Sequence, residues 1–208
     1  MQEHEQQRHG PGGFNRRDFL KGSSAAVAAT AIVTAEQEAL AQKKGSAPVQ
    51  GPGKVDVTLT VNGKQHKLSV EPRTTLLDAL RDQLNLTGCK DDFDTTSCSG
   101  SDTIIIDGKA VYASTRLAIE VQGQQIQTVE SLRNGNNIDE VLSGFVKHDA
   151  MQCGFCTPGF VMATRAFLNQ KPKATLKEIQ DGLGGNICRC GTYKGITACA
   201  LEIVKGGA

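Results

Sequence analysis

Four cysteines in two close pairs are the residues of this sequence best suited to chemistry. Cys153 and Cys156 form the first pair, Cys188 and Cys190 form the second, and 31 residues separate the two pairs. A thiolate is a strong, soft metal donor, and two thiolates two or three residues apart can reach one metal centre. Four such donors are what a [2Fe–2S] cluster needs. The spacing therefore favours an iron–sulfur site, although it does not say which cysteine binds which iron.

Two other uses of the four cysteines are compatible with the same spacing. One is a zinc site with four cysteine ligands, although zinc fingers more often have two C-x2-4-C pairs and a shorter separation. The other is a pair of disulfides, which requires an exported chain. A bridge between Cys188 and Cys190 would also be strained, because the two residues are so close in sequence.

The chain around Cys156 is suited to hold a negatively charged group. Thr157 and Pro158 follow it as N-cap and first-turn signals, and the apolar-rich residues 160–168 predict a helix. Cys156 is therefore expected at a helix N-terminus, where backbone N–H groups and the helix dipole favour negative charge.

The two cysteine motifs resemble the signature of a known family. Q-C-G-F-C-T-P-G at residues 152–159 and G-N-I-C-R-C-G-x-Y at residues 185–193 look like the small iron–sulfur subunit of molybdenum hydroxylases, the xanthine dehydrogenase and aldehyde oxidoreductase family. The match extends over residues 145–204. It implies one [2Fe–2S] cluster on the four cysteines and one-electron transfer as the function.

The resemblance also implies partners. A large subunit would bind a molybdopterin cofactor and oxidise an aldehyde or an N-heterocycle with water, so no catalytic residue is expected on this chain. Gln152 and Cys190 match family positions that touch the partner's pterin. An FAD subunit or a cytochrome could be the onward electron acceptor. The rival interpretation is a non-redox docking or structural subunit with a four-cysteine zinc site.

Residues 1–41 resemble a twin-arginine export signal. Arg16 and Arg17 are followed by Phe-Leu-Lys, an alanine-rich run covers residues 23–35, and Ala-Leu-Ala at residues 39–41 offers a cleavage site. The alternative is an amphipathic or disordered tail. The apolar run is too short to span a bilayer well. Export predicts a periplasmic protein, with residues 42–54 as a flexible linker.

Composition excludes some classes of function. The 208 residues carry a net charge of +1, which suggests no nucleic-acid partner. Seven cysteines are many for an ordinary domain and favour a metal protein.

The elements that must position the cysteines fall into two predicted domains. Alternating apolar residues predict a strand at residues 55–61, and the turn after it predicts its partner at 65–70. Leucines at helical spacing predict a helix at 74–84. An apolar run predicts a strand at 103–106, and further strands are predicted at 110–113 and within 117–128. This order is consistent with a β-grasp, plant ferredoxin-like domain over residues 55–130. Helices are predicted at residues 139–150, 158–168 and 194–204, and a further helix is opened by the Thr175–Glu178 capping box. The fold class is therefore α+β, with a four-helix [2Fe–2S]-binding domain over residues 137–205.

The first domain departs from the family pattern. In the family its loop carries a second [2Fe–2S] cluster, but alignment through residues 86–88 leaves only one thiol at the four ligand positions, which fall on Phe93, Cys98, Ser101 and Ser114. Cys89 lies at a position that the pattern does not use. We therefore expect one cluster in total. A Cys89–Cys98 disulfide, or an atypical second cluster, stays open.

Two further reactive side chains are predicted to be structural. Cys199 lies beside the apolar stripe of the last helix and is interpreted as a packing residue. His148 could carry a proton, but a structural role fits it better.

Overall fold

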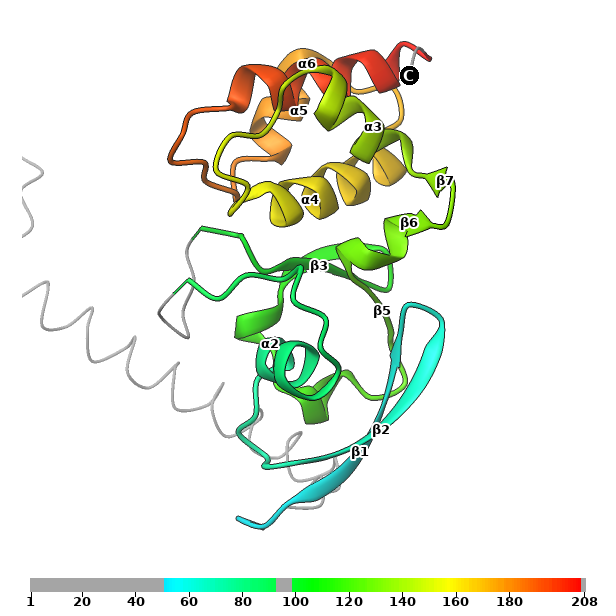
Figure 1. Cartoon of the computed structure of the whole chain (residues 1–208), viewed down its shortest axis with the longest axis vertical. Helices are drawn as coiled ribbons and strands as arrows, with labels where there is room; N and C mark the ends of the chain where they lie inside the picture. Colours follow the sequence, from blue (N-terminus) through cyan, green and yellow to red (C-terminus); the bar gives the residue numbers. More distant parts are fainter. Residues whose placement is uncertain (1–50, 93–98, 207–208) are drawn as a thin grey trace, which may run out of the picture. The chain divides into compact units, whose positions relative to one another are not determined.

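The computed structural model describes residues 51–92 and 99–206, which lie within one unit of the chain, Gln50–Ala208 (Figure 1). The predicted export signal, most of the predicted linker, and the ligand positions of Phe93 and Cys98 lie outside the described residues. In the described part of the chain, no helix is both long enough and apolar enough to cross a membrane.

Five strands form a mixed sheet in the order β2-β1-β5-β3-β4. The strands are β1 (Val55–Val61), β2 (Lys64–Val70), β3 (Thr103–Ile106), β4 (Lys109–Tyr112) and β5 (Gln125–Gln127). β1 and β5 run parallel, and the other neighbours are antiparallel. Four predicted strands are confirmed with end shifts of at most one residue, and β5 lies within the predicted range 117–128.

Two-residue turns fix the register of both hairpins. Asn62 and Gly63 have φ values of 51° and 76°, and Asp107 and Gly108 have φ values of 47° and 78°. Two consecutive positive φ angles define the type I′ turn, whose twist matches that of paired strands. Each turn is therefore determined locally, as the Asn-Gly and Asp-Gly pairs predict.

The predicted helix at residues 74–84 begins as an α-helix and then widens. Thr75 caps the single α-helical turn α2 (Leu76–Asp78) through its side chain, and the π-helix η1 (Ala79–Gln83) follows. The Leu84 N–H reaches back five residues to the Ala79 carbonyl. The predicted helix is confirmed as an element, and its second half is a π-helix; Leu76, Leu77 and Leu80 are buried in the core of the sheet.

Short elements that the sequence did not predict complete the connections. They are the 3-10 turns η2 (Ala113–Thr115), η3 (Ala118–Val121) and η4 (Val129–Leu132), and a small hairpin of β6 (Arg133–Asn134) and β7 (Asn137–Ile138).

Four helices pack together around a second apolar core. They are α3 (Glu140–Lys147), α4 (Thr157–Gln170), α5 (Leu176–Gly182) and α6 (Tyr193–Val204). Phe145, Phe160, Ile179 and Ile196 are each at most 1% exposed in this core. The capping box predicted for Thr175 and Glu178 is present at the start of α5.

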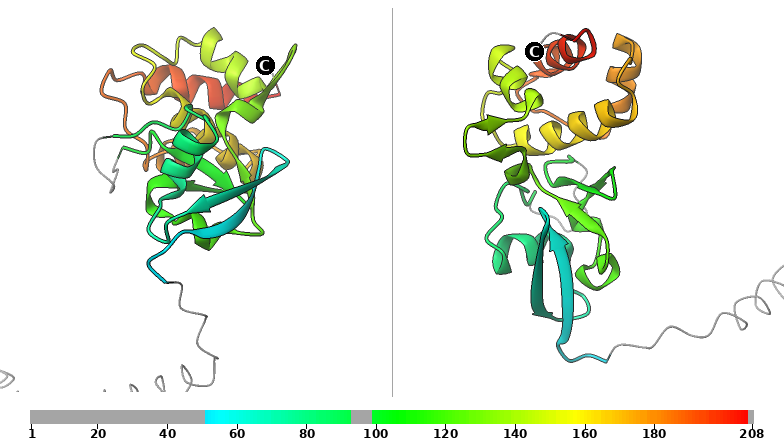
Figure 2. Two further views of the ribbon diagram at one scale, coloured as in Figure 1. Left: turned by 60° about the horizontal axis from the view of Figure 1, so that its bottom comes forward. Right: turned by 90° about the vertical axis from the view of Figure 1, so that its right-hand side faces the viewer.

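α4 lies between the sheet and the other helices (Figures 1 and 2). One of its faces enters the helical core through Phe160, and another contributes Met162 and Ala166, which pack on Ile105 of β3. The described chain is thus a mixed α/β structure, and α4 brings the first cysteine pair next to the loop that leads into β3.

Candidate metal centre

The first cysteine pair is positioned by the start of α4. Cys156 is the N-cap residue of this helix, Pro158 lies in its first turn, and Phe160 donates its N–H to the Cys156 carbonyl at 3.0 Å. The predicted place of Cys156 at a helix N-terminus is confirmed. Gly154 adopts a φ of 83°, so the chain turns back between Cys153 and Cys156 in a conformation that favours glycine.

The second pair is positioned by the turn that leads into α6. Gly191 has a φ of 80° and donates its N–H to the Cys188 carbonyl at 3.3 Å. The Cys188 N–H donates to the Tyr193 hydroxyl at 2.8 Å. The Tyr193 ring in turn meets Phe160 of α4 edge-on, with ring centroids 5.9 Å apart. This aromatic contact joins the second cysteine turn to the helix that carries the first.

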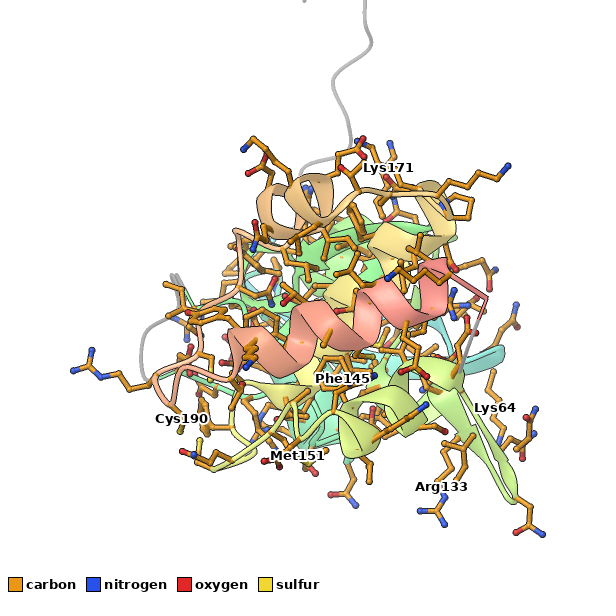
Figure 3. All side chains as sticks on the ribbon, turned by 90° about the horizontal axis from the view of Figure 1, so that it is seen from above. Lys64, Arg133, Phe145, Met151, Lys171 and Cys190 are labelled. Carbon is orange, nitrogen blue, oxygen red and sulfur yellow. The ribbon has the colours of Figure 1, made fainter. Side chains whose placement is uncertain are left out.

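Each cysteine of the first pair lies near a cysteine of the second pair. The thiols of Cys156 and Cys188 lie close enough to influence each other's pKa, and the Cys153 thiol likewise influences the pKa of Cys190. Cys156 and Cys188 are buried, whereas Cys153 and Cys190 are exposed. Figure 3 shows Cys190 on the loop before α6, at the edge of the molecule. The sulfurs therefore form a group with one buried side and one side open to solvent.

The two buried thiols, Cys156 and Cys188, have pKa values shifted in opposite directions. Burial, the hydrogen bond with Cys188 and the neighbouring sulfurs raise the pKa of Cys156 to about 12. Burial also acts to raise the pKa of Cys188, but hydrogen bonds from Thr192, Cys156 and the Cys190 N–H outweigh it and lower that pKa to about 7. One donor of the buried pair is thus held close to its thiolate form at neutral pH.

The donor set fits an iron–sulfur cluster better than the alternatives. The six cysteines in the described ranges are all free thiols, so the four do not form disulfides. A four-cysteine zinc site gathers all its ligands on one ion, whereas a [2Fe–2S] cluster distributes them over two irons.

Asn186, inside the second motif, joins the sheet loop to the helices. Asn186 is buried, and its side-chain amide donates to the Gly100 carbonyl at 2.8 Å and to the Thr103 hydroxyl at 3.0 Å. The Ile187 N–H donates to the Ser99 carbonyl at 2.8 Å. Sequence reasoning did not identify Asn186 as important. A polar residue between Gly185 and the apolar Ile187 is a weak signal of such a contact.

Gly159 of the first motif allows a close approach to the same loop. A Cβ atom at this position would lie 2.1 Å from the Gly100 carbonyl oxygen and 2.9 Å from the Ser101 Cα. Any side chain here would therefore push the first turn of α4 away from the loop. The glycine is required by packing of backbone on backbone.

The sheet loop has a hydrogen-bond network at the residues where the resemblance predicts thiolate ligands in the family. Ser101 and Ser114 are both buried. The Ser101 hydroxyl lies 2.8 Å from that of Ser99, and the buried Asp102 carboxylate accepts the Ser114 N–H at 2.8 Å. Within the described residues, the Ser114 hydroxyl itself has no hydrogen-bond partner.

Cys89 lies in the apolar core of the sheet rather than at a ligand position. Its side chain is 2% exposed, and burial together with Glu130 and Asp102 raises its pKa to about 12. Such a thiol is held in its protonated form. Whether Cys89 meets Cys98 is a question that lies outside the described residues.

The remaining predicted residues lie as follows. Gln152 is exposed beside Cys153. His148 ends α3 and pairs with Glu202, which also binds Lys147, so this histidine joins α3 to α6. Cys199 is fully buried against α3, and burial raises its pKa to about 11. The structural interpretation of His148 and Cys199 agrees with these contacts.

Two family models match parts of the chain. Residues 128–201 match the [2Fe-2S] binding domain, and residues 13–33 match the twin-arginine translocation pathway signal sequence. The first match covers both cysteine pairs. The second confirms the twin-arginine signal and, with it, export to the periplasm.

Relatives extend the match to nearly the whole chain. The aldehyde oxidoreductase iron-sulfur-binding subunit PaoA of Escherichia coli K12 is 38% identical over 93% of this chain and 89% of its own length. The nicotine 6-hydroxylase small subunit of Paenarthrobacter nicotinovorans is 38% identical over 72% of this chain and 89% of its own length. Quinoline 2-oxidoreductase from Pseudomonas putida 86 has a chain of similar structure, with a TM-score of 0.67, 35% identity, and coverage of 74% of this chain and 99% of that one. This chain belongs to the iron–sulfur-binding subunits of the xanthine dehydrogenase and aldehyde oxidoreductase family of molybdenum hydroxylases.

Proposed function

We propose that this chain carries electrons out of a periplasmic molybdenum hydroxylase through one [2Fe–2S] cluster held by Cys153, Cys156, Cys188 and Cys190. The observation that carries the proposal is the meeting of the two cysteine motifs, Cys156 with Cys188 and Cys153 with Cys190. When bound, the cluster takes up and passes on one electron at a time.

The protein around the four sulfurs would stabilise an anionic cluster. The N-terminus of α4 directs its dipole and its free N–H groups toward Cys156. Cys188 and Cys156 keep one side of the group away from water, and lower solvent exposure is one of the factors that set a cluster's potential. The exposed side, with Gln152 and Cys190, is proposed to face the pterin of the large subunit.

Exposed apolar side chains beside the cysteines support a docking surface for that subunit. Phe155, Ile187 and Tyr193 are 42%, 51% and 44% exposed, and each lies within three residues of a cysteine of the group. Between α5 and α6 a groove of about 670 Å³ continues this surface, and Ile187 and Tyr193 line it. Large apolar residues gathered in this way are typical of a protein interface.

The substrate class comes from the relatives. Their names refer to aldehydes and to the N-heterocycles nicotine and quinoline. We propose one of these two classes as substrate for the complex, with oxidation taking place on the partner. An FAD subunit or a cytochrome would then receive the electrons from this chain.

We also propose a domain organisation like that of the family. Residues 1–41 would be the signal peptide and residues 42–54 a linker. Residues 55–130 would form a β-grasp, ferredoxin-like domain without a cluster, and residues 137–205 the four-helix [2Fe–2S]-binding domain. The serine network in the sheet loop supports the loss of the second cluster, because hard oxygen donors replace soft thiolates poorly.

Reduction of the purified periplasmic complex tests this function. Substrate added without an external acceptor should bleach the visible absorption of the cluster and produce an EPR signal of one reduced [2Fe–2S] centre. A colourless protein that contains zinc would instead support the rival docking subunit. A coloured protein that dithionite reduces but no aldehyde or N-heterocycle reduces would contradict the proposed substrate class.

A further inference from the structure

Thr192 occupies the N-cap position of α6, yet its side chain does not cap the helix. A threonine at this position ordinarily accepts a hydrogen bond from the second or third N–H of the helix. The Thr192 hydroxyl oxygen instead lies 3.2 Å from the Cys188 sulfur. The Thr192 hydroxyl therefore forms its hydrogen bond with the Cys188 sulfur and not with the helix backbone.

The direction of this hydrogen bond follows from the chemistry of a metal ligand. A cysteine that binds iron is a thiolate without a proton, so the Thr192 hydroxyl must be the donor. The backbone N–H groups of Thr192 and Cys190 also act to lower the pKa of this cysteine. Of the four cysteine sulfurs, Cys188 is the one for which a hydroxyl donor is found in the described part of the chain.

We propose that the Thr192 hydroxyl raises the reduction potential of the cluster by donating to the Cys188 thiolate. This role rests on the proposed function, because it requires a cluster on the four cysteines. Reduction adds one electron, supplied by substrate oxidised on the partner, and it breaks no bond and moves no proton. The added charge is shared with the sulfur ligands, and a hydrogen bond to a more negative acceptor is stronger. The donor therefore stabilises the reduced state more than the oxidised state.

The substitution Thr192→Val in the full complex tests the proposal, since it keeps the shape and removes the hydroxyl. Potentiometric titration, followed by EPR and visible absorption, should show a more negative reduction potential with the iron content unchanged. Thr192→Ser, which keeps the hydroxyl, should return the potential to that of the wild type. A role in helix packing alone would not move the potential in this way.

Thr197→Val is the matched control. Thr197 is also on α6, and its hydroxyl donates to the Tyr193 and Lys194 carbonyls rather than to sulfur. This variant should leave the potential unchanged, so a shift as large as that of Thr192→Val would contradict the proposal.

The other outcomes separate this inference from the proposed function. A wild-type protein without a cluster would overturn both. A Thr192→Val protein with a full cluster and the wild-type potential would overturn the role of Thr192 and leave the proposed function intact. If Thr192→Val and Thr192→Ala both lose their iron while Thr192→Ser keeps it, the hydroxyl retains the cluster, and the proposal about the potential is wrong.

Discussion

The cysteine turns of the helical region and the loop before β3 are the two segments of this chain at which the family resemblance predicts a [2Fe–2S] cluster. In the helical region, four thiols meet between the starts of α4 and α6. In the described end of the sheet loop, the Ser99 and Ser101 hydroxyls contact each other and the Asp102 carboxylate accepts the Ser114 N–H. The comparison teaches that hydrogen bonds and burial can hold such a loop end in place, whereas binding a soft iron–sulfur cluster requires the thiolates themselves.

The two regions are not independent, because they contact each other directly. Asn186 donates to the loop at Gly100, and Gly159 lets the start of α4 approach the loop backbone. The helical motif can therefore support the loop without a second cluster. Substitution of a cysteine of the group should therefore change the iron content, whereas substitution at the contact between the two regions should change stability.

The largest contrast is expected between Cys156→Ala and Cys89→Ala. Loss of one of four ligands should remove the cluster, so Cys156→Ala should abolish the EPR signal and nearly all bound iron. Cys89→Ala changes only packing in the sheet core, and its iron content should equal that of the wild type. Iron and sulfide analysis of both variants checks the pair. Loss of iron in Cys89→Ala would show that the sheet loop binds metal.

Gly159→Ala should destabilise the contact between the two regions. Its Cβ would lie 2.1 Å from a backbone oxygen that cannot move without the loop, and overpacking of this kind costs about 1–3 kcal/mol. Denaturant unfolding of the protein with its cluster measures the effect. Gly51→Ala is the control, because nothing lies within 4 Å of its Cβ. Equal stability of both variants would mean that the close approach is not maintained.

Asn186→Ala should have a smaller effect of the same kind. The substitution removes the hydrogen bonds to Gly100 and Thr103. This loss should lower the free energy of unfolding by about 1–2 kcal/mol. Asn137→Ala, at an exposed position of β7, is the control. If Asn186→Ala and this control have the same stability in thermal and denaturant unfolding, the Asn186 hydrogen bonds do not stabilise the loop.

Ser114→Ala should change least. Within the described residues its buried hydroxyl has no partner, so its removal loses no hydrogen bond and relieves the desolvation cost of an unpaired group. The free energy of unfolding should equal that of the wild type or rise by up to about 1 kcal/mol. The iron content should also stay unchanged. A clear fall in either quantity would mean that Ser114 has a ligand in the native protein.

Local patterns in the sequence predicted most of the elements. Asn62-Gly63 and Asp107-Gly108 specify type I′ turns by themselves, and Thr175 with Glu178 specifies the start of α5. The closeness within each cysteine pair was predictable for the same reason, whereas the meeting of the two pairs was predicted from chemistry, because one [2Fe–2S] cluster needs four thiolates.

Contacts between distant segments could not be read from the sequence. Asn186 and Gly100 are 86 residues apart, and no periodicity links them. The hydroxyl of Thr192 could equally have capped α6, and only the structure shows it at the Cys188 sulfur. The widening of the helix after Asp78 likewise depends on the sheet on which it packs.

The number of irons and acid-labile sulfides per chain tests the central claim most directly. One [2Fe–2S] cluster in the helical region and none in the sheet loop predicts about two irons and two sulfides, with a single EPR signal after reduction. Four irons with two distinguishable signals would contradict the account of the sheet loop. Zinc in place of iron would contradict electron transfer by this chain altogether.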